Sequence, residues 1–160
     1  MLFRSLLRQT TIEETLRFHG GEIAGTLACD GSVIKGRTWR SQRLAAELTT
    51  LTVGGNVEFR RGFKAGGVVL LDDSEIGGTF DCSEGIFESG YDPARLGRMD
   101  RWDRGVRALK CHRLILGGSL YLRDAHCEGE LSFSGAQIGG DIDCRNGKFR
   151  WAGKIGRAHV

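Results

Sequence analysis

The chain has 160 residues, the size of one domain with its own hydrophobic core. Glycine accounts for 25 residues and proline for one, a combination that excludes collagen and proline-rich disorder. The formal net charge of +3 is small and indicates no particular class of partner. No stretch approaches the roughly 18 apolar residues of a membrane span, so no transmembrane segment is expected.

The cysteine content indicates the expected compartment. The chain has five cysteines, and its N-terminus interrupts the apolar stretch with arginines, unlike a secretory leader. We therefore expect free thiols in a reducing compartment. The expected location is the cytoplasm, with peripheral attachment to a membrane as the alternative.

In chain order, the dominant pattern is a seven-residue motif that recurs five times. It consists of an apolar residue, Gly or Ala, Gly, any residue, an apolar residue, any residue, and then Cys, Phe or Leu. The copies occupy residues 23–29, 53–59, 76–82, 116–122 and 138–144. A weaker alternating segment lies near residues 13–18, 66–71 and 128–133. Half-units follow one another at about 11 residues, with one longer step from Gly55 to Gly67, so the full repeat is about 22 residues.

Apolar alternation over short segments is the period of a β-strand. With glycines at fixed places and about 22 residues per repeat, it predicts an all-β fold, a right-handed parallel β-helix (β-solenoid) with about 22 residues per turn. Each Gly-Gly step marks a corner, where a positive φ or a close backbone approach excludes a Cβ. In stacked turns, equivalent residues of the motif would lie one above another and form an inward ladder: Leu27, Val57, Phe80, Leu120 and Ile142.

A second inward ladder would lie beside the first, formed by Cys29, Phe59, Cys82, Leu122 and Cys144. Adjacent turns are about 4.8 Å apart, so cysteines two turns apart are separated by about 9.6 Å, beyond the reach of a disulfide. No Cys-x-x-Cys pair occurs, and the cysteines are therefore expected to fill the core, with a redox or metal role as the alternative. No metal and no cofactor are expected.

The inward positions from Leu116 to Phe149 alternate in steps of six and five residues. This spacing resembles that of pentapeptide-repeat proteins, which are four-sided solenoids, but departs from their strict five-residue step. The segment 138–144, Ile-Gly-Gly-Asp-Ile-Asp-Cys, is similar to repeats of bacterial proteins that are sometimes labelled membrane-associated oxidoreductases. No Gly-x-Gly-x-x-Gly fingerprint occurs, so the resemblance implies the fold rather than a dinucleotide-dependent activity.

The last seven residues, 154–160, resemble a translated sequencing adapter. The expected organisation is therefore a single solenoid domain over residues 1–153, followed by a non-native tail over 154–160. A solenoid that ends inside a turn exposes strand edges and apolar core, which predicts self-association through its open ends.

Two insertions interrupt the period, at about residues 30–45 and 84–107. Both rejoin the repeat at the same register, so they are expected to form two inserted loops on one side, two turns apart. Insertions on a common side of a repeat protein often form its binding surface. The predicted binding residues are basic and aromatic: Arg37, Trp39, Arg40, Arg98, Arg101 and Trp102. Packing of the tryptophans against the solenoid is the alternative interpretation.

Three outward carboxylates are weak candidates for catalysis: Glu58, Asp81 and Asp143. Adjacent carboxylates on a β-helix face can hold a cation or act as glycosidic acid and base. The alternative is a solvated strand face. No Gly-x-Ser-x-Gly elbow, phosphate-binding loop or zinc-protease motif is present, so an enzyme is the less expected class.

These patterns predict a non-catalytic β-solenoid scaffold or interaction module. It would bind a protein or an anionic partner through the Arg/Trp-bearing insertion loops. Two alternatives remain open at this point: a β-helix enzyme acting on polysaccharide, and a protein that binds anions or nucleic acid.

Overall fold

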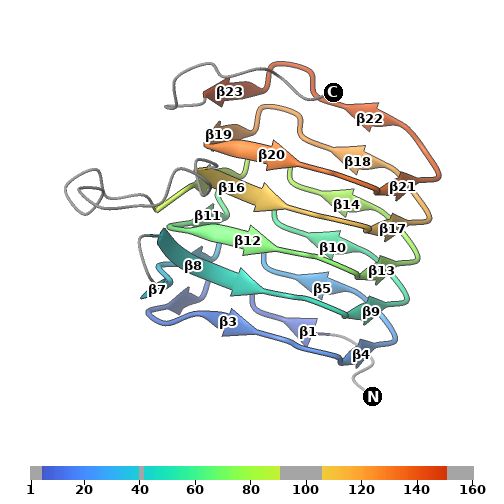
Figure 1. Cartoon of the computed structure of the whole chain (residues 1–160), viewed down its shortest axis with the longest axis horizontal. Coiled ribbons are helices and arrows are strands. Elements are labelled where there is room, and N and C mark those ends of the chain that lie inside the picture. Colours follow the sequence, from blue (N-terminus) through green and yellow to red (C-terminus); the bar gives the residue numbers. More distant parts are fainter. Residues whose placement is uncertain (1–4, 40–41, 91–105, 151–160) are drawn as a thin grey trace.

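The computed structural model describes residues 5–39, 42–90 and 106–150. Its regular elements are short β-strands, with no helix among the described residues. The chain passes through four parallel sheets in the same order in each turn, so the cross-section has four sides, here called faces 1 to 4 (Figure 1). Partners such as Ser5 with Leu27 and Leu120 with Ile142 are 22 residues apart. The predicted all-β parallel solenoid is confirmed.

The strands of each face are stacked from the N-terminal to the C-terminal turn. Face 1 contains β1 (Ser5–Leu6), β5 (Leu27–Ala28), β10 (Val57–Glu58), β14 (Phe80–Asp81), β18 (Leu120–Tyr121) and β22 (Ile142–Asp143). Face 2 contains β2 (Thr11–Ile12), β6 (Val33–Ile34), β11 (Lys64–Ala65), β15 (Ile86–Glu88), β19 (His126–Glu128) and β23 (Lys148–Arg150).

Faces 3 and 4 complete each turn. Face 3 contains β3 (Leu16–Arg17), β8 (Gln42–Glu47), β12 (Val68–Leu70), β16 (Arg107–Lys110) and β20 (Glu130–Ser132). Face 4 contains β4 (Glu22–Ile23), β9 (Thr52–Val53), β13 (Glu75–Ile76), β17 (Ile115–Leu116) and β21 (Gln137–Ile138). The remaining strand, β7 (Arg37–Trp39), pairs with β8 in antiparallel fashion.

The register of face 1 follows the repeated motif. Leu27 pairs with Val57, Val57 with Phe80, and the ladder continues through Leu120 to Ile142. The third turn contains the longer step, because the corner between β10 and β11 has one residue more than the equivalent corner between β14 and β15. Arg61 and Gly62 both adopt a positive φ there, 52° and 85°, and accommodate the additional residue.

The Gly-Gly corners between faces 4 and 1 need glycine because of close backbone approach and not because of a positive φ. A Cβ on Gly117 would lie 2.4 Å from the carbonyl oxygen of Gly77, and one on Gly77 would lie 2.6 Å from that of Gly54. Ala24 occupies this position in the first copy of the motif. Its strand, β4, is the edge of face 4 among the described residues, so no described turn lies beneath its methyl group.

The inward ladders form a continuous hydrophobic core. Cys29, Phe59 and Cys82 are fully buried, as the motif predicts. Cys144 is the exception, since the structure places it at the exposed end of the ladder, in the last described turn of face 1. The prediction of a buried position for Cys144 is therefore wrong, because no described turn covers it.

Thiol labelling should separate Cys144 from the other cysteines. All five are free, and Cys29, Cys82, Cys111 and Cys127 are buried. Burial also raises the pKa of the Cys82 thiol well above its usual value, which suppresses the reactive thiolate. We expect a maleimide to modify Cys144 at least tenfold faster than any buried cysteine, as measured by peptide mass mapping of the native protein. Equally rapid labelling of Cys82 would contradict its burial.

Both insertions leave face 2 and rejoin the solenoid on face 3, in the second and fourth turns (Figure 1). The first is shorter than the expected range of about 30–45, because β6 belongs to face 2 and β8 begins at Gln42. The expected range of the second insertion is about 84–107. Of this range, β15 belongs to face 2 and β16 begins at Arg107. Residues 91–105 lie outside the described part of the chain. The described ends of both insertions therefore lie on one side of the solenoid.

The described residues contain no helix with the length and apolar character needed to cross a bilayer.

Candidate functional site

The bases of the two insertions are in direct contact, although a full turn of the solenoid separates them in the stack. The amide side chain of Gln42, at the start of β8, donates hydrogen bonds to the carbonyl oxygens of Ser89 and Arg107, at 3.1 and 2.6 Å. These carbonyl groups lie just before and just after the second insertion. In addition, the backbone N–H of Arg43 donates to the carbonyl of Gly90 at 3.2 Å. One side chain of the first insertion thus links both ends of the second.

Two glycines in the intervening turn make this contact sterically feasible. Gly66 and Gly67 form the corner between faces 2 and 3 in the third turn. A Cβ on Gly67 would lie 2.5 Å from the carbonyl oxygen of Arg43, and one on Gly90 would lie 2.5 Å from the Arg43 Cβ. Side chains at these positions would force the two insertions apart. We call the combined surface the insertion edge, which comprises residues 35–39, 42–43, 64–67, 88–90 and 106–107.

The insertion edge contains a pocket of about 220 Å³. Its lining residues are Val33, Ile34, Lys35, Arg43, Lys64, Gly66 and Glu88. They come from the second, third and fourth turns and include three cations and one carboxylate. The local charge of the pocket lining is therefore positive, while the formal charge of the whole chain is only +3.

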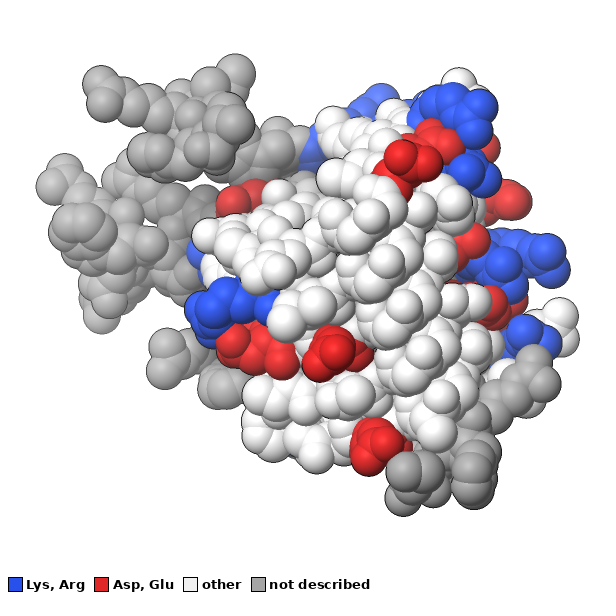
Figure 2. Space-filling view, turned by 90° about the vertical axis from the view of Figure 1, so that its right-hand side faces the viewer, with Lys and Arg blue, Asp and Glu red and all other residues white. Residues whose placement is uncertain are grey.

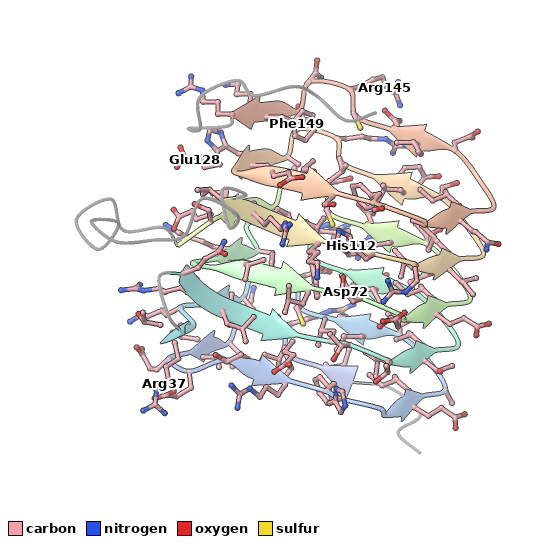
Figure 3. All side chains as sticks on the ribbon, in the orientation of Figure 1. Arg37, Asp72, His112, Glu128, Arg145 and Phe149 are labelled. Atoms are coloured by element: carbon pink, nitrogen blue, oxygen red, sulfur yellow. The ribbon has the colours of Figure 1, made fainter. Side chains whose placement is uncertain are left out.

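Of the predicted binding residues, Arg37 can be placed in full. It lies at the start of β7, with its side chain 77% exposed and its guanidinium 3.7 Å from a carboxylate oxygen of Glu14 (Figure 3). Trp39 ends the same strand. The other four predicted residues lie outside the described residues: Arg40, Arg98, Arg101 and Trp102.

Two components of the insertion edge are absent from the sequence-based prediction. Gln42 is a single polar residue in a basic stretch, and nothing in its local sequence indicates a contact with residues 47 and 65 positions further along the chain. Lys64 lies in a regular strand outside both insertions. The signal that could have identified the contact is the glycine pair Gly66-Gly67. This pair forms the corner between faces 2 and 3 in the third turn, and the insertions occupy the same corner in the second and fourth turns.

The candidate catalytic carboxylates on face 1 are held by arginines. Glu58 and Asp81 are register partners in adjacent turns, as their spacing predicts. The Arg60 guanidinium donates two hydrogen bonds to Asp30, at 3.1 and 2.9 Å, and another to Glu58 at 3.0 Å. It also lies 3.7 Å from Asp81. The three carboxylates therefore surround one guanidinium, and Arg8 lies 3.8 Å from Asp30 and 3.6 Å from Glu58, so two cations offset part of the negative charge on this face.

Asp143 lies at the end of the same face and is bound by two further arginines. Hydrogen bonds from Arg145 and then Arg123 hold the pKa of its carboxyl group well below the usual range. Arg123 Nε lies 2.6 Å from Asp143 Oδ2. A general acid needs a carboxyl pKa near the working pH. The arginines shift Asp143 in the opposite direction, so this carboxyl group is a poor proton donor near neutrality.

A second polar cluster lies on face 3 (Figure 3). The backbone N–H of His112 donates to Asp72 at 2.9 Å, and Lys110 Nζ donates to the same carboxylate at 2.6 Å. The His112 Nε2 atom lies 2.7 Å from the Ser132 hydroxyl oxygen. Asp72 thus contacts the backbone of His112 and not its ring, which differs from the carboxylate–imidazole contact of a catalytic triad.

The position of His112 leads to an expected loss of stability in mild acid. Burial, followed by the nearby Lys110 ammonium, lowers the pKa of His112 from its usual 6.5. Its stabilising contribution is therefore complete above the unfolded-state pKa and is lost as the pH falls through the folded-state pKa. Urea midpoints measured from about pH 7.5 down to about pH 5 should fall more steeply for the wild type than for His112→Gln. Parallel slopes for the two proteins would contradict this role.

Face 4 has a different surface. Figure 2 looks onto this face and its Gly-Gly corners, where uncharged residues predominate and a few acidic residues lie among them. The outward positions of face 4 include Glu22 and Glu75. Ile115 on β17 is 46% exposed there. Among the residues described, no three His, Cys, Asp or Glu side chains lie together in a group that could bind a metal ion.

The insertion edge is therefore the candidate site, because it combines a pocket, positive charge and contact between distant chain segments. The carboxylates on face 1 are bound by arginines, and the charged residues in the described strands of face 4, Glu22 and Glu75, are both acidic and lie two turns apart. Comparisons of the chain with protein-family models, with curated proteins and with solved structures find no match.

Proposed function

We propose that the protein is a non-catalytic β-solenoid interaction module that binds an acidic protein partner through the insertion edge. The observation that carries the proposal is the bridge from Gln42 to the carbonyls of Ser89 and Arg107. This bridge joins two loops from different turns into one surface. Loops that project from one side of a stacked repeat are the usual binding elements of such proteins.

The charge of the edge supports an acidic partner. The pocket lining contributes three cations, Lys35, Arg43 and Lys64. Arg37, which follows Lys35 closely in the chain, has an exposed side chain. The sequence between residues 90 and 106, both of which belong to the edge, contains Arg98, Arg101 and Trp102. Arginine and tryptophan are frequent among the residues that carry most of the binding energy in protein interfaces.

The repeat class and the cellular setting are part of this proposal. Steps of five and six residues, together with four faces per turn, support a pentapeptide-like repeat of the kind found in bacterial proteins. The free cysteines support a reducing compartment and hence the cytoplasm. Self-association through the solenoid ends stays a prediction, supported by the exposure of Ile142 and Phe149 in the last described turn.

Site-specific crosslinking tests the binding surface. A photo-reactive amino acid at position 37 should crosslink a partner in cells, whereas the same group at position 52, on face 4, should not. The double variant Arg37→Glu/Arg43→Glu should reduce recovery of the crosslinkable partner at least tenfold, because it places acidic groups opposite an acidic surface.

The matched control reverses two arginines on another face. Both side chains are exposed. Arg17 lies in β3 on face 3, and Arg113 lies in the corner that follows β16 on the same face. Arg17→Glu/Arg113→Glu should leave partner recovery unchanged. Equal recovery with both double variants, or equal crosslinking from positions 37 and 52, would overturn the proposed function.

A further inference from the structure

The pocket at the insertion edge exists because Gly66 interrupts a column of outward side chains on face 2. The residue pairs Ala65–Ile34 and Ala65–Phe87 are in register, so Gly66 lies between Lys35 and Glu88 in that column. A Cβ on Gly66 would lie 2.9 Å from the carbonyl oxygen of Lys35. The glycine is therefore needed for stacking, and its missing side chain leaves a gap one turn high.

The cations around this gap retain donors for a ligand. Lys35 Nζ lies 2.8 Å from Glu13, and Lys64 Nζ lies 3.0 Å from Glu88. An ammonium group has three N–H donors, so each lysine keeps two beyond these ion pairs. Arg43 is exposed and lines the same pocket. Several charge-assisted hydrogen bonds are thus available to one anionic group.

The surroundings favour a carboxylate on a peptide over a phosphate backbone. Acidic residues follow the gap in the same column, because Glu88 is in register with Glu128. A continuous polyanion along face 2 would meet both glutamates, whereas a single acidic side chain in the pocket would lie near Glu88 alone, which is paired with Lys64. The partly exposed apolar residue Val33 also lines the pocket, and Ile86 in the same column as Val33 and Lys64 is 37% exposed. An adjacent apolar residue of a peptide can pack against these side chains.

We propose that this pocket binds the carboxylate of an acidic side chain, next to an apolar residue, in a segment of the protein partner. The carboxylate would be shared among Lys35, Lys64 and Arg43. This assignment rests on the proposed function for its biological ligand, but the pocket chemistry can be tested without the partner.

The direct test titrates the isotope-labelled protein with the capped dipeptide acetyl-leucyl-glutamate amide and follows backbone amide shifts by NMR. We expect saturable shifts centred on Lys64, Gly66 and Arg43. The matched acetyl-leucyl-glutamine amide should bind at least tenfold more weakly, because it lacks the charge. Lys64→Met and Arg43→Met should each weaken binding of the glutamate dipeptide at least threefold.

Lys148→Met is the matched control. Lys148 belongs to the same outward column as Lys64, linked through Ile86 and His126, but lies outside the pocket. Its loss should leave the affinity unchanged. Equal weakening by Lys148→Met, equal binding of the glutamine dipeptide, or the absence of saturable shifts at the pocket would overturn the proposal. Tighter binding of inorganic phosphate at the same residues would overturn the carboxylate assignment.

The two proposals fail in distinguishable ways. If the dipeptide does not bind but crosslinking still depends on Arg37 and Arg43, the pocket assignment is wrong and the interaction function stands. If the dipeptide binds and partner recovery ignores the insertion edge, the pocket chemistry stands and the interaction function is wrong.

Discussion

Replacing Gly117 by alanine is expected to lower the free energy of unfolding by about 3 kcal/mol. The new methyl group would lie 2.4 Å from the carbonyl oxygen of Gly77, a backbone atom that cannot move without disturbing the turn below. The loss arises from this contact and not from φ, which is not positive at Gly117. Urea denaturation followed by circular dichroism would measure the change.

Gly21→Ala provides the matched control. Gly21 also lacks a positive φ, and the atom nearest to its added Cβ would be a methyl carbon of Leu51 at 3.6 Å, an ordinary van der Waals distance. Its stability should stay within about 0.5 kcal/mol of the wild type. Equal losses for Gly117→Ala and Gly21→Ala would show that close stacking of the corners is not the reason for the repeated glycines.

Phe63→Ala is expected to cost about 3–5 kcal/mol. Phe63 is fully buried, and its ring stacks on Phe59 with a centroid separation of 4.5 Å. It also contacts Phe87, at a centroid separation of 5.5 Å. Removing the ring would leave a cavity in the third turn and remove both aromatic contacts. The same denaturation experiment would report the loss.

Phe149 offers the comparison for the aromatic core. It belongs to the inward column of face 2, in register with Cys127, but 43% of it is exposed in the last described turn. Phe149→Ala should therefore cost under about 1 kcal/mol. If both phenylalanine variants lost the same stability, the core would not be concentrated in the central turns as the burial pattern indicates.

The sequence predicts the stacking of the turns because stacking is a periodic property. The register from Leu27 through Val57 to Phe80 follows directly from the repeated motif. The longer step before Gly67 also has a local origin, in the additional residue at Arg61-Gly62. Periodicity alone leaves open the reason for each Gly-Gly pair. The structure shows that close backbone approach is the reason at these corners.

The composite site could not be predicted in the same way, because it depends on contacts between non-repeating segments. The sequence places both insertions on one side but does not show that Gln42 reaches Ser89 and Arg107. Likewise, the pairing of Glu58 with Asp81 is predictable from the turn spacing. The position of Arg60 between them depends on the path of a long side chain from a corner.

The alanine at position 24 bears on whether a further turn can stack beneath the first one. If another turn continued face 4 in register beneath β4, its corner carbonyl would face the Ala24 methyl group, at the position where the later turns need glycine. In the chain itself, a Cβ at that position would lie 2.4–2.6 Å from the carbonyl oxygen of the turn beneath, as it would at Gly54 and Gly77. An in-register turn beneath β4, from any chain, would therefore meet a steric barrier, and one methyl group would oppose further stacking at this corner.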